Sequence, residues 1–221
     1  MGEIVKTTAD IGLLKDNQII GNVEIGNNVE INFSGKNNIL YFFSDNSVIS
    51  NCIINFRASN ALLFCTSKNM KNMRVFLYHN CWVYYRSGYV NGSLQDGTLM
   101  YVDEGKGVFI SSNHRFAKNI VLRTGDMHEI WDATSGERIN HSKSIFIGDH
   151  VWLGYGTTLL KSTQIGSGAI VGLGSVVAGK KIPSNTSWAG NPAKQIKTAV
   201  MWGGGLQCDV FTGKNCRAVP H

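Results

Sequence analysis

A short polar segment in the second half of the chain carries side chains that can move protons. The segment VLRTGDMHEIWDATSGERINHSKS contains Asp126, His128, Glu129 and Asp132. Histidine has an ordinary pKa of about 6.5, so its neutral imidazole can accept a proton from an attacking hydroxyl group near pH 7. Asp126 lies two residues before His128, on the same side of an extended chain, where its carboxylate either fixes the imidazole tautomer or caps a turn. We take this segment as the candidate site.

The elements that must position this segment form a repeat. Aliphatic residues recur every six positions, at Ile147, Leu153, Leu159, Ile165, Val171 and Val177. The next residue is glycine at four of these places, namely Gly148, Gly154, Gly166 and Gly172. The same spacing recurs less regularly at Ile19, Ile25 and Ile31. It also recurs at Val102, Val108 and Ile120, with His114 at the position between the last two. A period of six excludes an amphipathic helix, whose period is about 3.6 residues.

A six-residue unit suits one short strand and a turn, and three units suit a triangular coil. Stacked coils form a parallel β-solenoid whose aliphatic side chains point inward. The glycines are expected at tight corners that need unusual backbone angles. Because the end of a solenoid leaves strand edges unpaired, a cap is expected there. The segment AKQIKTAVMW after Pro192 predicts a short helix as that cap, with Ile196 and Val200 on one face.

We expect a single all-β domain over residues 1–221, because no linker or low-complexity segment divides the chain. The predicted parts are irregular coils over about 18–100, regular coils over about 102–183, a functional loop over about 123–145 and the cap over about 192–221. Aromatic residues gather in Arg74–Val90. They suit either a sugar-stacking platform or, as is more common for aromatic residues in strands, a core or a subunit interface.

Composition narrows the class of protein. Of 221 residues, 43% are apolar and 16% are charged, with 25 glycines and 3 prolines, which excludes general disorder and favours β-structure with tight turns. No run approaches the roughly 18 apolar residues of a membrane span, and the first residues lack the pattern of a signal peptide. The five cysteines form no CxxC pair and are odd in number, so we expect a reduced, cytoplasmic protein.

Positive charge is concentrated near the C-terminus. Residues 161–221 carry seven Lys and Arg and only one acid, Asp209, which accounts for the whole net charge of +6. Such a region suits a polyanionic ligand, either nucleic acid, membrane headgroups or a phosphorylated cofactor, or else a solvated surface. Nucleic acid is disfavoured, because the lysines are sparse and lack interleaved aromatic residues. The histidines have no spacing that supports a zinc trio, so no metal is expected.

The stretch VLRTGDMHEIWDATSGERIN, followed by IFIGDHVWLGYGTTLLKSTQIGSGAIVGLGSVVAGKKIPSNTSWAGNPAKQIK, resembles the hexapeptide-repeat O-acetyltransferases of bacterial capsule and lipopolysaccharide synthesis. It is similar in particular to enzymes that acetylate capsules containing sialic acid, and the likeness is specific over about residues 108–197. The resemblance implies a left-handed parallel β-helix. The family's R-T-S-D-x-H-x-I motif implies that His128 is catalytic, with Gly125 where serine is common. The tryptophan of its V-W-I-G segment, Trp152 here, is also implicated in the active site.

The resemblance implies transfer of an acetyl group from acetyl-CoA to a sugar hydroxyl, with His128 as the general base. The oxyanion that develops on the thioester needs a preorganised donor, which either a backbone N–H near Trp152 or its indole N–H supplies. Two alternatives stay open. One is N-acetylation of an amino sugar or a nucleotide-linked amino sugar, which needs the same base. The other is a non-enzymatic binding or structural β-helix, which has little reason to extrude a polar loop.

The resemblance also implies where acetyl-CoA binds. Trp152, Tyr155, Leu173 and Ala178 are expected along the pantetheine arm, and Lys180, Lys181 and Lys194 near the phosphates. Cationic side chains are the natural partners of those phosphates. Trp188 either stacks on the adenine or packs against the cap. Family members are threefold trimers with the site in the groove between prisms, so we expect a homotrimer.

Overall fold

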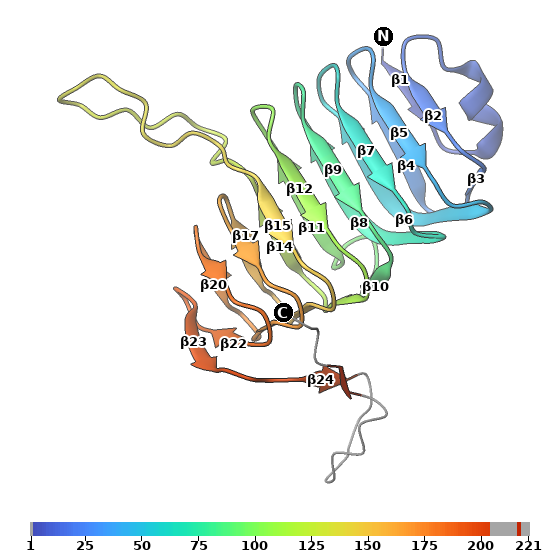
Figure 1. Cartoon of the computed structure of the whole chain (residues 1–221). Helices are drawn as coiled ribbons and strands as arrows, with labels where there is room; N and C mark the ends of the chain where they lie inside the picture. The colour runs from blue at the N-terminus through green and yellow to red at the C-terminus, as the bar shows by residue number, and fades with distance from the viewer. Residues whose placement is uncertain (1, 204–215, 218–221) are drawn as a thin grey trace.

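The chain folds as a three-sided parallel β-helix (Figure 1). This computed structural model describes residues 2–203 and 216–217. Each coil passes in turn through sheets that we name A, B and C, and successive coils pair in parallel. The predicted solenoid is therefore confirmed. We name each edge of the prism by the two sheets that it joins, as the A–B, B–C and C–A edges.

The strands of the three sheets are short and numerous. Sheet A contains β1 (Glu3–Val5), β3 (Val23–Ile25), β4 (Val29–Phe33), β6 (Ser47–Phe56), β8 (Asn69–Leu77), β11 (Thr98–Val102), β14 (Ile120–Arg123), β17 (Thr158–Leu160) and β20 (Val176–Val177). Sheet B contains β2 (Gln18–Ile20), β5 (Ile39–Phe42), β7 (Leu62–Cys65), β9 (Trp82–Tyr85), β12 (Gly107–Ile110), β15 (Ile145–Ile147), β18 (Gln164–Ile165) and β21 (Lys181–Ile182). Sheet C contains β10 (Gly88–Val90), β13 (His114–Phe116), β16 (Trp152–Leu153), β19 (Ile170–Val171), β22 (Ser187–Ala189) and β23 (Lys194–Lys197).

The six-residue phase of the sequence becomes the inner wall of the regular coils. Ile147 pairs with Ile165, so one coil is 18 residues long. Leu153 pairs with Val171 at the same interval. These side chains are 0–3% exposed and stack on one another down the prism. His114, which interrupts the phase, also points inward, because it replaces an aliphatic residue in β13 and is 1% exposed.

The coils of the N-terminal half are longer than the regular ones. Ile31 pairs with Ile54, Ile54 with Val75 and Val75 with Met100, at intervals of 23, 21 and 25 residues. Strands β6 and β8 turn through Asn51 and Asn72, which adopt left-handed backbone angles. Their first halves therefore lie on the third side of the prism, in line with β3 and β10.

Asparagines rather than glycines take most of the left-handed corners in the first half. Asn28, Asn51 and Asn72 have φ angles of 55°, 49° and 59°. Asparagine tolerates this conformation because its short side chain can bond locally. Here the amide of Asn28 donates to Asn51 (3.0 Å), and that of Asn72 donates to the carbonyl of Val90 (3.0 Å). These ladders fix how one coil sits on the next.

The repeat glycines serve a purpose different from the predicted one. Gly148, Gly154, Gly166 and Gly172 are not among the residues with positive φ. They are small because the next coil is close. A Cβ on Gly154 would lie 2.6 Å from the amide nitrogen of Leu173, and one on Gly166 would lie 2.4 Å from that of Ser184. The prediction of unusual backbone angles at these positions is therefore wrong, and the constraint is contact between coils.

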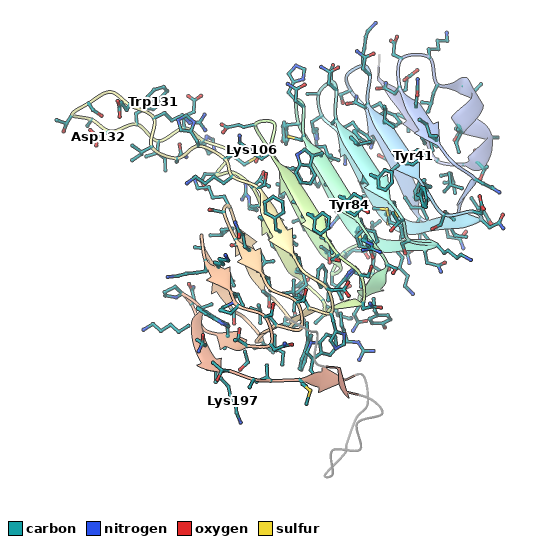
Figure 2. The ribbon with its side chains drawn as sticks, viewed as in Figure 1. Tyr41, Tyr84, Lys106, Trp131, Asp132 and Lys197 are labelled. Atoms are coloured by element: carbon teal, nitrogen blue, oxygen red, sulfur yellow. The ribbon has the colours of Figure 1, made fainter. Side chains whose placement is uncertain are left out.

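The aromatic stretch does not form one flat platform. Tyr85 is buried, whereas Phe76, Tyr84 and Tyr89 lie on three different sides of the prism. Tyr84 belongs to a column on sheet B in which Tyr41, Phe64, Tyr84 and Phe109 have ring centroids 5.0–5.2 Å apart (Figure 2). Since Phe64 and Tyr84 each have a neighbouring ring on both sides, the middle of this column has no open face for stacking sugars.

The two ends of the prism are closed differently. At the N-terminus β1 runs antiparallel to β4 and is followed by the 3-10 helix η1 (Thr8–Leu13). At the C-terminus the predicted helix is wrong, because Lys194–Lys197 form β23, which pairs antiparallel with β22. This pairing satisfies the open strand edge, and Ile196 stays 68% exposed where a helix would bury it. Residues 204–215 and 218–221 of the predicted cap lie outside the described residues.

The remaining C-terminal elements and tryptophans extend this end. A short pair of strands follows, β24 (Trp202–Gly203) with β25 (Cys216–Arg217). Trp188 is half-buried against the core, and its indole N–H donates to the hydroxyl of Thr186 (3.0 Å). Within the part of the chain that the structure describes, we find no helix long and apolar enough to cross a membrane.

Cys52, Cys65 and Cys81 are free thiols in the core. Burial raises the pKa of Cys52 and of Cys65 to about 12, so both remain protonated at neutral pH. We therefore treat these cysteines as small apolar core residues.

We expect Gly97→Ala to lower the free energy of unfolding by about 3 kcal/mol, because overpacking against rigid backbone has this size. The new Cβ would lie 2.1 Å from the carbonyl oxygen of Asn72 in the neighbouring coil. Urea denaturation followed by circular dichroism measures the change. Gly12→Ala is the matched control, since a Cβ there meets nothing within 4 Å. Equal stability of the two variants would contradict the close packing of these coils.

Candidate active site

The predicted functional loop is an arm that leaves the A–B edge between β14 and β15. This arm, residues 124–144, extends away from the prism, with Trp131 and Asp132 near its tip (Figure 2). It folds as a small hairpin in which Trp131 bridges to Arg138. The carboxylate of Asp132 accepts hydrogen bonds from the amides of Thr134 and Ser135, both at 2.8 Å. Asp132 is thus a turn residue at the tip.

Asn140 ties the base of the arm together. Its amide nitrogen donates to the carboxylate of Asp126 (2.9 Å) and to the backbone carbonyl of His128 (2.7 Å). Its amide oxygen accepts from the backbone N–H of Ile130 (2.8 Å). With these contacts Asn140 is 7% exposed. One side chain therefore fixes the backbone on both sides of the histidine.

Asp126 is engaged by a lysine from the next coil. Its carboxylate forms an ion pair with Lys161, whose ammonium group also donates to the carbonyl of Asn140 (2.9 Å). The hydrogen bond from Lys161 lowers the pKa of Asp126, and the amide of Asn140 acts in the same direction. Of the two roles left open for Asp126, this geometry matches the structural one. Its carboxylate anchors the turn, and no hydrogen bond joins it to the imidazole in the described chain.

His128 lies exposed on the arm, at the side that faces the N-terminal coils. It lines a cavity of about 570 Å³ together with Tyr78, Met127 and Arg138. Its imidazole makes no hydrogen bond to any of residues 2–203. Both ring nitrogens are therefore available to a ligand in this cavity.

A buried acid and an ion pair form the floor of this cavity. Glu104 pairs with Arg138 and accepts a hydrogen bond from the amide of Ser142 (2.9 Å). That backbone hydrogen bond is the main reason why the pKa of Glu104 falls to about 2. Burial raises the pKa of Asp103, which is 8% exposed, above its ordinary value. These contacts connect the arm to the coil beneath it.

A second cavity lies on the C-terminal side of the arm. It measures about 490 Å³ and is lined by Asp126, Lys143, Lys161, Ala178 and Gly179, among others. Ala178 was predicted as a cofactor-lining residue. Lys180 follows on the same A–B edge and is exposed. The A–B edge thus presents two cavities with the histidine arm between them.

Gly125 has a steric reason to replace the serine that the motif commonly carries. A Cβ at this position would lie 2.3 Å from the hydroxyl of Ser142 and 3.0 Å from the carboxylate of Asp103. Ser142 is itself 3% exposed. Its hydroxyl fills the space beside the glycine.

Trp152 lies on the far side of the prism from His128. It belongs to β16 of sheet C, whereas the arm leaves the opposite A–B edge. Trp152 is 40% exposed, and its ring centroid lies 6.0 Å from that of Trp202. Trp202 stacks on His150 at 3.9 Å, and its indole N–H donates to the carbonyl of His150 (3.0 Å). The C-terminal segment therefore braces Trp152 from one side.

The other predicted cofactor residues are divided between two regions. Tyr155 and Leu173 lie on the C–A edge, stacked through a hydrogen bond from Gly174 to the carbonyl of Tyr155 (2.8 Å). They are 50% and 74% exposed. Lys181 begins β21 on sheet B, and Lys194 begins β23 at the C-terminal end. A single chain brings Asp126 and Ala178 to one cavity and His128 to the other cavity of the A–B edge, and it leaves Trp152, Tyr155 and Leu173 on other sides.

Comparisons with known proteins agree with this architecture. The chain is 30% identical over 186 residues to the polysialic acid O-acetyltransferase of Neisseria meningitidis, covering 83% of this chain and 84% of that protein. The crystal structure of the polySia-specific acetyltransferase NeuO matches with a TM-score of 0.73 and 27% identity over 88% of this chain and 90% of that one. No protein-family model matches the chain.

The chain belongs to the hexapeptide-repeat O-acetyltransferases. Its fold is accordingly the left-handed parallel β-helix, which the polysialic acid O-acetyltransferase OatWY also shares, with a TM-score of 0.56 and 24% identity over 90% of this chain and 92% of that one. The chain is therefore an acetyltransferase. The expectation of an enzyme rather than a structural β-helix is confirmed.

Three residues that contact the arm of the candidate site were not predicted from the sequence. Asn140 and Lys161 lie 14 and 35 residues from Asp126 in sequence, and coil stacking brings them to it. Glu104 lies in the coil before the arm and meets Arg138 near its end. No short motif joins residues at these separations, so only a known coil register could have identified them.

Lys161→Gln should lower kcat by about tenfold to a hundredfold, because misplacement of a catalytic group by about 1 Å has this effect. Loss of the ion pair leaves Asp126 with Asn140 only. Lys36→Gln, which removes an exposed ion pair with Asp16 in the first coils, is the control and should retain most activity. Steady-state kinetics and thermal melting of both variants measure the effect. An unchanged kcat for Lys161→Gln would contradict the role of this ion pair.

The pH at which the arm loses its order distinguishes loss of this ion pair from a general loss of stability. A carboxyl group whose pKa is lowered in the folded state stabilises that state above its unfolded pKa of about 3.9, and the effect disappears as pH falls through the folded value. The contribution of Asp126 to arm order should therefore persist to below pH 4 in the wild type. In Lys161→Gln it should be lost nearer pH 4, as followed by the fluorescence of Trp131.

Proposed function

We propose that this enzyme transfers the acetyl group of acetyl-CoA to a hydroxyl of an acidic surface-polysaccharide sugar, with His128 as the general base. The position of His128 carries the proposal. It lies on the arm between two cavities of the A–B edge, with its imidazole open to a ligand. The acidic character of the sugar is supported by the relatives, which are named for polysialic acid.

The two cavities suit the two substrates differently. The C-terminal cavity has Lys143 at its wall and Lys180 beside it, which fits the phosphates of coenzyme A. The backbone at Ala178 and Gly179 offers a narrow, small-residue wall for the pantetheine arm. The N-terminal cavity then takes the acceptor, with Tyr78 and Arg138 at its wall.

The reaction needs no covalent enzyme intermediate. His128 takes the proton from the acceptor hydroxyl as its oxygen forms a bond to the acetyl carbonyl carbon. The carbonyl electron pair moves to oxygen, where a preorganised N–H donor stabilises it, and Trp152 of the partner subunit is our candidate. The pair returns as the carbon–sulfur bond breaks, and the imidazolium gives its proton to the leaving thiolate. The products are the sugar acetate ester and free coenzyme A.

We infer that the active unit is a homotrimer. Trp152, Tyr155 and Leu173 lie away from His128 in one chain, so contact of one chain's A–B edge with the C-terminal coils of the next chain, from Trp152 onward, would unite them. The arm supports this, because Met127, Ile130, Trp131 and Ile139 are 45–63% exposed on it. A contact between different surfaces of identical chains closes into a ring of three when it rotates each chain by a third of a turn. Sedimentation that gave a stable monomer at micromolar concentration would contradict this assembly.

We also propose that the enzyme works in the cytoplasm. The proposal rests on its donor, acetyl-CoA, and on Cys52, Cys65 and Cys81, which are free thiols. Fractionation of cells that express the chain, with assays of each fraction, tests this placement.

Release of free thiol from acetyl-CoA, measured against a panel of acceptors, tests the activity. The panel contains polysialic acid, sialic acid monomer, lipopolysaccharide sugars and amino sugars. We expect release with an acidic polysaccharide and a product whose acetyl group is removed by mild alkali, as an ester is. Product that resists alkali would indicate N-acetylation, and release with amino sugars alone would contradict the proposed acceptor.

A further inference from the structure

The central coils contain a block of sequence with basic residues and no acidic ones. Residues 46–95 contain no aspartate or glutamate and five basic residues, Arg57, Lys68, Lys71, Arg74 and Arg86. This block is separate from the basic C-terminal quarter and from the arm. Lys68, Lys71 and Arg86 are all exposed. They lie on the third side of the prism or on the edge that leads into it, because β8 begins there and β10 follows.

One column on this side alternates cations and aromatic rings. In the sheet C register Tyr89 pairs with Arg115, and Arg115 pairs with Trp152. Lys71, from the preceding coil, places its ammonium group 5.7 Å from the centre of the Tyr89 ring. The guanidinium of Arg115 lies 5.4 Å from the same centre. We name Lys71, Tyr89, Arg115 and Trp152 the cationic column.

The ring of Tyr89 holds the two cations apart and in place. Lys71 and Arg115 belong to the coils before and after Tyr89, so they approach it from opposite sides. Two strand spacings separate them, about 9.6 Å along the axis. Cation–π contact restrains both side chains, which reduces the entropy that they lose when they bind an anion. Among the residues that the structure describes, Tyr89 and Trp152 are 46% and 40% exposed.

Two fixed cations in line suit a polymer with repeated negative charges. Single-stranded nucleic acid is disfavoured, because its bases stack on open aromatic faces and those of Tyr89 are covered by Lys71 and Arg115. A carboxylated sugar chain needs no such stacking and can place successive carboxylates against the cations. The column also leads to Trp152, which lies next to Arg115 in the register.

We propose that the cationic column binds an acidic polysaccharide chain and guides it toward the acetyl-transfer site. Carboxylates of the polymer contact Lys71 and Arg115, and the chain continues toward Trp152. This proposal deepens the proposed function and rests on it for the direction of the chain. It predicts that long acidic acceptors are preferred over short ones, because a short acceptor does not reach from the site to Lys71.

Kinetics with acceptors of two lengths test the column. In Lys71→Gln/Arg115→Gln, KM for polysialic acid should rise about tenfold or more, with kcat and KM for acetyl-CoA unchanged. KM for a sialic acid dimer should change less than twofold. Tyr89→Ala should also raise the polymer KM, and Tyr89→Phe should restore it, since phenylalanine keeps the ring. The control Lys15→Gln/Lys36→Gln removes equal charge from the first coils and should match the wild type.

An unchanged polymer KM in the column variants, or an equal rise in the control, would overturn the proposal. Tighter binding of single-stranded RNA than of polysialic acid by the wild type would also overturn it. Direct binding of fluorescently labelled polysialic acid, measured without acetyl-CoA, separates this proposal from the proposed function. Binding that depends on Lys71 and Arg115 without any acetyl transfer would support the column and contradict the function.

Discussion

His128→Ala should lower kcat by about a hundredfold or more while leaving the fold intact, since loss of a general base has this effect. The side chain is exposed and its imidazole bonds to no other described residue, so its removal leaves no cavity in the core. The contacts of Asn140 go to the backbone carbonyl of His128 and survive the substitution. KM for acetyl-CoA should therefore stay within a few-fold of the wild-type value.

Thiol release with a productive acceptor measures this loss. His128→Gln is the more stringent variant, because glutamine keeps a polar side chain but cannot take the proton at neutral pH. Glu137→Gln, an exposed residue of the same arm that lines neither cavity, controls for general damage to the arm and should retain most of kcat. If His128→Gln kept most of its kcat, another group would have to be the base and the arm would lose its assigned role.

Mixing two inactive variants should restore activity, and this is the second large effect that we expect. If His128 of one subunit acts with the partner subunit's Trp152, a trimer that contains both His128→Ala and Trp152→Ala chains has some sites with two intact residues. Random assembly of a cyclic trimer from equal amounts makes about a quarter of the interfaces intact. Activity should therefore recover to about a quarter of the wild-type value from two preparations that are each nearly inactive.

The two variants are denatured together, refolded and compared with each refolded alone. The double variant His128→Ala/Trp152→Ala, refolded with the wild type, is the control for the statistics of mixing. Failure to recover activity, with mixed trimers demonstrated by mass spectrometry, would place both residues in one subunit's site or remove Trp152 from the chemistry. Recovery without mixed trimers would equally contradict the shared site.

The regular half of the fold could be predicted because its signal is local. The six-residue phase from Ile147 to Val177 reports directly which side chains point inward. The arm could be predicted for the same reason, because a polar segment interrupts that six-residue phase. The C-terminal cap was predicted as a helix because the spacing of Ile196 and Val200 suits one. The segment forms a strand instead, because the open edge of β22 offers it hydrogen-bond partners.

The site could be predicted only where a motif carried it. His128 stands in such a motif, but Asn140 and Lys161 reach it through folding of the arm and stacking of coils. The cationic column is hidden for the same reason. Lys71, Tyr89, Arg115 and Trp152 lie 18, 26 and 37 residues apart, so no single period joins them. Irregular coil lengths in the first half conceal which residues share a side.

The arm is inserted at a corner of the prism without a change in the register of the coils, which suggests how such enzymes gain new segments. Across it, Leu122 pairs with Leu159 at an interval of 37 residues, compared with 18 between Leu159 and Val177. The register of sheets A and B is the same before and after the arm. Doubling the length of a closed loop adds only about 0.6 kcal/mol of chain entropy. Corners of this prism can therefore acquire new segments during evolution, or by design, with little thermodynamic penalty to the scaffold.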